Sequence, residues 1–293
     1  MTIKKKLILG AAQFSGTYGF DKATYNLTKS EIKQIFICMK NNGIGFLDTS
    51  LEYNEVSKKI RLYKTEKLKF ITKIKFKNDD LTNKNEKQIK DIIYKRLLSS
   101  KKEINIKYFH SLLIHNFELL ELNNQKKLFN VLLNLKKNKE LSKIGFSIYD
   151  FKKLKFTLKK FKPDIIQCPY NIFDRRLNDI YLKKIIRKKK ISIHVRSIFL
   201  QGLLLLDPAN LPKKFLKWKS KFIKWHDWSK KKDIKKIDAI FSFLKDNKDI
   251  DKIIFGVQDL KQLKEILSLK IKKIRIPNYL ESKDKNLISP NLW

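Results

Sequence analysis

The stretch YFHSLLIHNFELLELNNQKKLFNVLLNLKKNKELSKIGFSIY (residues 108–149) contains one complete strand–helix–strand unit. Residues 108–115 and 143–149 are short apolar runs, which are typical of buried strands. Between them, residues 118–138 carry Leu128, Leu132 and Leu135 at the spacing of one helix face. Parallel neighbouring strands need a crossover connection, usually a helix, so this unit predicts a parallel sheet covered by helices.

The same alternation continues along almost the whole chain. An open doubly wound sheet usually carries a G-x-G-x-x-G turn after its first strand, and LGAAQFSGTYG (residues 9–19) does not fit that pattern. Eight units in 293 residues fit a closed (β/α)8 TIM barrel better, and we expect residues 1–293 to form a single domain of this kind. The expected strands are residues 6–14, 44–49, 69–76, 108–115, 143–149, 164–170, 191–199 and 252–257. The expected helices are residues 30–42, 84–104, 118–138, 150–161, 177–190, 234–247 and 259–269, with Ser30 as the N-cap of the first.

The connection of residues 200–233 is longer than the others. Phe215, Trp218, Phe222 and Trp225 recur in it at helical spacing. We expect a helix packed across the rim of the barrel, and an amphipathic helix at a membrane surface is the alternative. Long loops after barrel strands commonly shape a ligand pocket.

The formal net charge of +38 raises the question of nucleic-acid binding. Of the 67 basic residues only seven are Arg and 60 are Lys, spread along the whole chain. Base readout and bidentate phosphate recognition favour Arg, so we expect solvent-facing lysines and no specific nucleic-acid partner. A general attraction for anionic ligands still follows from such a charge.

Neither the N-terminal residues nor the cysteine usage indicates export. The first residues, MTIKKKLILGAAQF, resemble a signal peptide but lack a small-x-small cleavage site, and a first strand explains them equally well. No stretch reaches the roughly 18 apolar residues of a membrane span. Cys38 and Cys168 lie in apolar contexts without metal-type spacing, so we expect two buried thiols and no metal site. A cytoplasmic protein is the resulting expectation.

Four polar residues stand at or just past the ends of three expected strands: Asp48, Tyr53, Lys73 and His115. In a (β/α)8 barrel the active site lies at these ends. A carbonyl that accepts hydride needs a proton donor, and a phenol becomes a usable acid when a buried ammonium lowers its pKa. The ammonium in turn needs a carboxylate, and an imidazole can orient the carbonyl oxygen.

These requirements assign Lys73 to Tyr53, Asp48 to Lys73, and His115 to the substrate oxygen. Each residue taken alone also has a structural explanation, as a loop cap, a half-buried aromatic, one of 60 lysines or a core histidine.

In these residues and their order the sequence resembles the aldo/keto reductase family. The matching motifs are LGAAQF, GIGFLDTSLEY, ITK, LLIHN, KIGFSIYD, IIQCPYNIFDRR, RSIFLQGLLL and IIFGVQDLKQL, which cover nearly the whole chain. The resemblance implies an NAD(P)H-dependent reductase whose catalytic tetrad is Asp48, Tyr53, Lys73 and His115, with Tyr53 protonating the oxygen. It also implies a set of cofactor-binding residues: Gly10, Ser147, Gln167, Ser197, Gly256, Val257, Gln258 and Gln262.

The chain departs from the family pattern at three places. NEVSKK follows Tyr53 where many members have a Gly and a Ser-Glu pair, and Ile148 stands where an Asn is frequent. The loop after the eighth strand lacks an Arg for a 2′-phosphate, while Lys261 and Lys264 lie nearby, so NADP(H) is only slightly favoured over NAD(H).

The substrate expected from the resemblance is a small-molecule carbonyl compound, with a sugar-like or small aldehyde suggested by the FLQGLLL and IFDRR segments. The alternatives are a non-catalytic NADP(H)-binding sensor or subunit with the same barrel, and a polyanion-binding protein. The oligomeric state is open.

Overall fold

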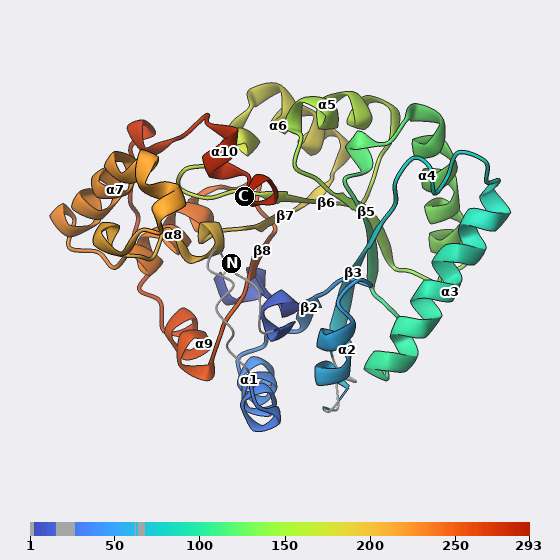
Figure 1. Cartoon of the computed structure of the whole chain (residues 1–293), viewed down its shortest axis with the longest axis horizontal. Coiled ribbons are helices and arrows are strands. Elements are labelled where there is room, and N and C mark those ends of the chain that lie inside the picture. Colours follow the sequence, from blue (N-terminus) through green and yellow to red (C-terminus); the bar gives the residue numbers. More distant parts are fainter. Residues whose placement is uncertain (1–2, 16–26, 62, 64–67) are drawn as a thin grey trace.

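The computed structural model describes residues 3–15, 27–61, 63 and 68–293, and within them eight parallel strands form a closed barrel (Figure 1). Each strand pairs with the next along the chain, and the last pairs with the first. The (β/α)8 barrel predicted from the sequence is therefore confirmed. The strands are β1 (Leu7–Gly10), β2 (Phe46–Asp48), β3 (Lys69–Lys75), β4 (Ser111–His115), β5 (Lys143–Ser147), β6 (Ile165–Pro169), β7 (Ser192–Arg196) and β8 (Lys252–Phe255).

Helices surround this barrel on the outside (Figure 1). All seven helices expected from periodicity are present, although Ser30 is not the first N-cap. Thr28 caps that helix, because its hydroxyl accepts a hydrogen bond from the Glu31 backbone N–H and the Glu31 carboxylate accepts one from the Thr28 backbone N–H. The helices are α1 (Lys29–Asn41), α2 (Asn54–Ile60), α3 (Glu86–Ile104), α4 (Leu122–Lys137), α5 (Phe151–Lys160), α6 (Ile180–Lys189), α7 (Lys219–Lys231), α8 (Lys236–Asp246), α9 (Leu260–Leu267) and α10 (Lys285–Ile288).

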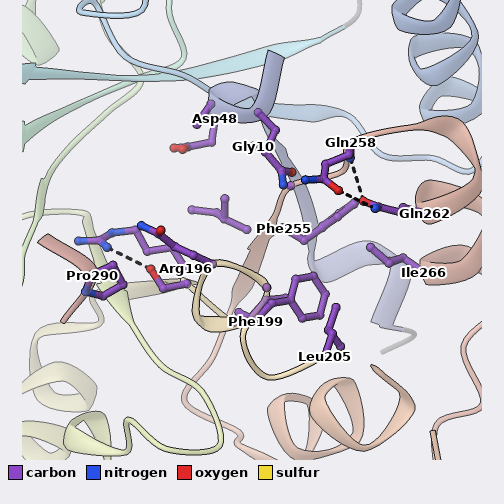
Figure 2. A pocket seen from close by; sticks show the side chains of 18 of the residues that line it. Gly10, Asp48, Arg196, Phe199, Leu205, Phe255, Gln258, Gln262, Ile266 and Pro290 are labelled. Carbon is purple, nitrogen blue, oxygen red and sulfur yellow. Dashed lines mark hydrogen bonds between the residues drawn. The ribbon is translucent and has the colours of Figure 1, made fainter. Parts of the chain in front are cut away.

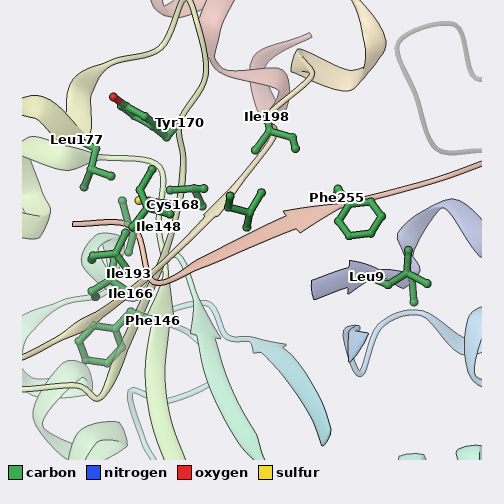
Figure 3. Packing of buried hydrophobic residues seen from close by; sticks show 14 of the residues in the cluster. Leu9, Phe146, Ile148, Ile166, Cys168, Tyr170, Leu177, Ile193, Ile198 and Phe255 are labelled. Carbon is green, nitrogen blue, oxygen red and sulfur yellow. The ribbon is translucent and has the colours of Figure 1, made fainter. Parts of the chain in front are cut away.

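The apolar core has two parts. A large cluster fills the space between the strands and the helices, and Figure 3 shows a section of it around Phe146, Cys168 and Phe255. A small cluster fills the barrel itself, and its members are Ile8, Ile71, Leu113, Ile165 and Ile254. The barrel is thus a packed core, and any ligand must bind above this filling.

Only one of the two cysteines is fully buried. Burial raises the pKa of the Cys168 thiol to about 12, which keeps it protonated and unreactive. Cys38 on α1 is half-buried against the large cluster, so the expectation of two buried thiols is wrong for this residue. Its position on an outer helix leaves one side of the thiol uncovered.

The long connection after β7 contains α7, whose apolar face packs against the protein. Phe215, Phe222 and Trp225 are buried. The Trp225 indole N–H donates to the Leu204 carbonyl at 2.9 Å, and the Phe222 ring packs edge-on against Phe173. These contacts support the expected packed helix. Among the described residues, no helix is long and apolar enough to cross a membrane.

Candidate active site

The candidate active site is a layer of side chains directly above the apolar filling of the barrel. Side chains two residues apart in a strand point to the same face of the sheet. Gly10, Lys73, His115, Gln167 and Gly256 each follow by two residues a member of the interior cluster, namely Ile8, Ile71, Leu113, Ile165 and Ile254. Asp48 pairs with Gly10 and Ile71 and joins the same layer. Strand alternation thus delivers the predicted residues to one mouth of the barrel.

A buried ion pair occupies this layer. Lys73 Nζ donates to Asp48 Oδ2 at 2.6 Å, and the two side chains are 4% and 10% exposed. Gln167 Nε2 donates to Asp48 Oδ1 at 2.8 Å, and the Ser147 hydroxyl donates to Gln167 Oε1 at 3.4 Å. Both carboxylate oxygens of Asp48 therefore have partners, which a buried ion pair requires if it is not to destabilise the fold.

The loop after β2 brings Tyr53 to the same mouth. The Leu51 N–H and the Ser50 hydroxyl both donate to the Lys73 carbonyl, at 2.9 and 3.3 Å. Tyr53 N–H then donates to the Ser50 carbonyl at 3.1 Å. The Glu52 carboxylate, which accepts from the Lys75 N–H, fixes the same loop to β3 from the other side. The backbone of this loop is thus attached to the strand residue that carries the ammonium.

His115 is held in its neutral form. Burial lowers the pKa of the His115 imidazole to about 3, and the nearby charges of Lys73, Arg196 and Lys75 act in the same direction. A neutral imidazole keeps one N–H donor and one acceptor. His115 can therefore donate a hydrogen bond to a substrate oxygen throughout the neutral pH range without adding a charge.

The buried histidines make stability depend on pH. Burial also lowers the pKa of His194, on β7, to about 3. In the unfolded chain each imidazole takes up a proton near pH 6.5, and in the folded chain it does not until about pH 3, so stability is lost as pH falls through this window. We expect the free energy of unfolding to fall by up to about 2 kcal/mol per histidine between pH 7 and pH 5. Urea unfolding at both pH values should show a smaller pH dependence for His115→Gln and for His194→Gln, and an unchanged one would contradict the neutral assignment.

The tetrad residues line a cavity of about 560 Å³ that extends beyond the barrel mouth (Figure 2). Asp48, Tyr53, Lys73 and His115 all lie on its wall. The wall also contains six of the eight expected cofactor-binding residues: Gly10, Gln167, Ser197, Gly256, Gln258 and Gln262. Ser147 and Val257 are fully buried and do not line the cavity, Ser147 lying behind Gln167 and Val257 in the large core cluster.

At the α9 end of the cavity, two glutamine side chains are bound to each other. The Gln258 backbone N–H donates to Gln262 Oε1 at 2.8 Å, and the Gln262 side chain donates through Nε2 to Gln258 Oε1 at 3.1 Å, as the dashed lines in Figure 2 show. The Asp259 carboxylate caps α9 by accepting the Gln262 N–H at 2.7 Å. The start of α9 is thereby fixed by an acidic N-cap.

Sequence reasoning missed several residues of the cavity wall. Arg196 ends β7, and its guanidinium lies 4.0 Å above the Tyr149 ring and donates to the Ile148 carbonyl at 3.0 Å. The signal available in the sequence was a polar residue at the end of a strand, two positions after His194. The wall residues Pro290 and Asn291 come from the C-terminal segment, and nothing in their local sequence indicated this position.

The IFDRR segment explains how the C-terminal segment reaches the cavity. Arg175 Nη2 donates to the Pro277 carbonyl at 2.9 Å, and Ser282 N–H donates to the Phe173 carbonyl at 2.8 Å. Arg176 forms an ion pair with the buried Asp174 at 2.7 Å. Both arginines donate hydrogen bonds to backbone carbonyls of other segments, and neither lines the cavity. The segment therefore has a structural role.

A buried Lys–Asp pair, a phenol and an imidazole thus lie together at the C-terminal mouth of a closed parallel barrel. The aldo/keto reductase family model matches residues 6–276, and the chain belongs to this family. It is therefore an oxidoreductase by family, as the sequence motifs predicted. No curated protein matches the sequence.

Solved structures share the fold at low sequence identity. A putative aldo-keto reductase from Pseudomonas aeruginosa is 14% identical with a TM-score of 0.62, covering 92% of this chain and 91% of its own. An aldo-keto reductase from Bacillus halodurans, in its holo form, is 16% identical with a TM-score of 0.67, covering 89% and 85%. A glycerol dehydrogenase from Gluconobacter oxydans is 15% identical with a TM-score of 0.63, covering 91% and 88%.

Proposed function

We propose that this protein is an NAD(P)H-dependent reductase that converts an aldehyde or ketone into an alcohol. The observation that carries the proposal is the buried Lys73–Asp48 ion pair on the same cavity wall as Tyr53 and His115. A buried ammonium paired with a carboxylate is costly to maintain and needs a reason beyond packing. Activation of a neighbouring acid is such a reason.

Each tetrad residue has a separate role in this proposal. The dinucleotide, when bound, supplies the hydride that adds to the carbonyl carbon. Tyr53 donates its phenolic proton to the oxygen that becomes negatively charged. Lys73 stabilises the phenolate that remains, Asp48 keeps Lys73 charged, and His115 orients the oxygen through its N–H.

The cavity has features that suit a dinucleotide. Gln13 Oε1 is buried on the wall without a hydrogen-bond partner among the described residues, and it is an acceptor for an amide or ribose hydroxyl. A Cβ at Gly256 would lie 2.0 Å from this oxygen, so a side chain there would displace Gln13. Ser197, at a left-handed φ of 55°, lies at the start of the loop that lines the cavity after β7. Gly10, Gln167, Gln258 and Gln262 complete the cofactor set that we propose.

The proposed substrate is a small-molecule carbonyl compound, with sugar-like or small aldehydes as the first candidates, and the proposed setting is the cytoplasm. The test is a panel of aldehydes, ketones and aldoses in which oxidation of NADH and of NADPH is followed separately by absorbance. We expect turnover with at least one carbonyl of the panel. Binding of a dinucleotide without any turnover would instead support a sensor or subunit and would contradict this proposal.

A further inference from the structure

We propose that the cavity selects the dinucleotide without a 2′-phosphate, NAD(H), and that Asp259 and Glu265 exclude NADP(H). This inference rests on the proposed function and specifies its cofactor. The slight preference for NADP(H) drawn from the sequence depended on Lys261 and Lys264. Both lysines are exposed, and neither lies on the cavity wall, whereas Glu265 lines it and Asp259 is hydrogen-bonded to the wall residue Gln262.

The shape of the cavity assigns the adenosine half of a dinucleotide to α9. The nicotinamide has to reach the substrate carbonyl, and so it must lie at the barrel mouth beside Tyr53, Lys73 and His115. The wall also includes Leu205, and it reaches Gln262 and Ile266 on α9, outside the barrel (Figure 2). A long ligand anchored at the mouth must place its other end there.

The charges of the wall differ between these two ends. Among the described residues that line the cavity, the Lys and Arg side chains are Lys73 and Arg196, and both lie at the mouth. The α9 end is lined by Gln258 and Gln262, which are bound to each other, and by the carboxylate of Glu265. The chain has 67 basic residues, yet no Lys or Arg lies on this part of the described wall.

The start of α9 adds a second negative charge. A helix N-terminus favours anions, but here the Asp259 carboxylate already accepts the Gln262 N–H at 2.7 Å. An added phosphate would meet the Glu265 carboxylate on the wall and, behind Gln262, the Asp259 cap, which costs free energy through like-charge repulsion. A ribose diol, in contrast, donates hydrogen bonds that carboxylate and amide oxygens accept, which is the usual way to recognise NAD.

Two further cations line a neighbouring groove of about 530 Å³ that shares Glu265 with the main cavity. This groove shares Leu205, Ile237 and Glu265 with the main cavity and contains Lys235 and Lys236. Lys236 Nζ donates to the Leu206 carbonyl, and burial lowers its pKa. Neither lysine lines the main cavity, so the groove does not offset the Glu265 carboxylate on its wall.

Direct binding separates this inference from the proposed function. The intact chain is titrated with NADH and with NADPH by isothermal titration calorimetry at about 150 mM salt, which screens the general surface charge. We expect Kd for NADH to be about tenfold or more below that for NADPH. Equal or tighter NADPH binding overturns the selectivity and leaves the reductase proposal standing, whereas binding of neither dinucleotide overturns both.

The variant Asp259→Asn, which removes the negative charge, tests the role of Asp259. Asp259→Asn keeps an N-cap, because Asn caps helices as well as Asp does, so α9 is retained. We expect it to tighten NADPH binding several-fold and to change NADH binding less than about twofold. Glu265→Gln is the second variant, with the same expectation. Asp91→Asn, an exposed residue on α3, changes the net charge equally and should leave the ratio of the two Kd values unchanged. An unchanged ratio in both Asp259→Asn and Glu265→Gln overturns the assignment.

Discussion

Tyr53→Phe is expected to lower kcat for carbonyl reduction by about 10²–10⁴-fold while dinucleotide binding is retained. The change removes one oxygen from a half-buried ring that packs on the core, so the fold should persist. In this variant the N–H of the neutral His115 imidazole is too weak an acid to replace a phenol activated by Lys73. Steady-state kinetics on the carbonyl that turns over, together with Kd for the dinucleotide, measures both parts.

The control for this substitution is Tyr94→Phe, which makes the same chemical change on the exposed face of α3. It should retain the parent kcat. If Tyr53→Phe reduces its carbonyl substrate at the parent rate with the parent Kd, Tyr53 is not the proton donor. A loss of dinucleotide binding in parallel with activity would also contradict the assignment, because it would mean that the phenol holds the ligand.

Much of the mouth was predictable because it depends on local rules. Apolar runs that end in Asp48, Lys73 and His115 predict strands that deliver a polar side chain, and the two-residue alternation above the interior cluster explains why all three point inward. The closure of the barrel followed from counting units. These features require only the sequence near each strand.

Contacts between distant segments were not predictable in the same way. Gln167 binds Asp48 across 119 residues, and its amide could not be distinguished by sequence from one that faces a ligand. The C-terminal residues Pro290 and Asn291 reach the cavity because the arginines after β6 hold the intervening chain. The mutual hydrogen bonds of Gln258 and Gln262 depend on the exact geometry at the start of α9, which periodicity does not specify.

Lys73→Met is expected to lower activity by at least about 10²-fold and also to lower the free energy of unfolding by about 3–5 kcal/mol. The second effect arises because the variant leaves the Asp48 carboxylate buried with, among the described side chains, only the Gln167 amide as a partner. Since native domains are stable by about 5–15 kcal/mol, the variant should still fold. Urea unfolding and steady-state kinetics measure the two effects separately.

The double variant Asp48→Asn, Lys73→Met separates catalysis from stability. Removing both charges should recover a large part of the lost free energy of unfolding, because no buried charge is left without a partner. Activity should stay at the level of Lys73→Met, because the ammonium that activates Tyr53 is still missing. Lys155→Met, which breaks the partly exposed pair with Asp179 at 2.5 Å, should cost at most about 1 kcal/mol and leave activity unchanged. If the double variant regained activity along with stability, the role of Lys73 would be to hold the fold, and the chemistry proposed for it would be wrong.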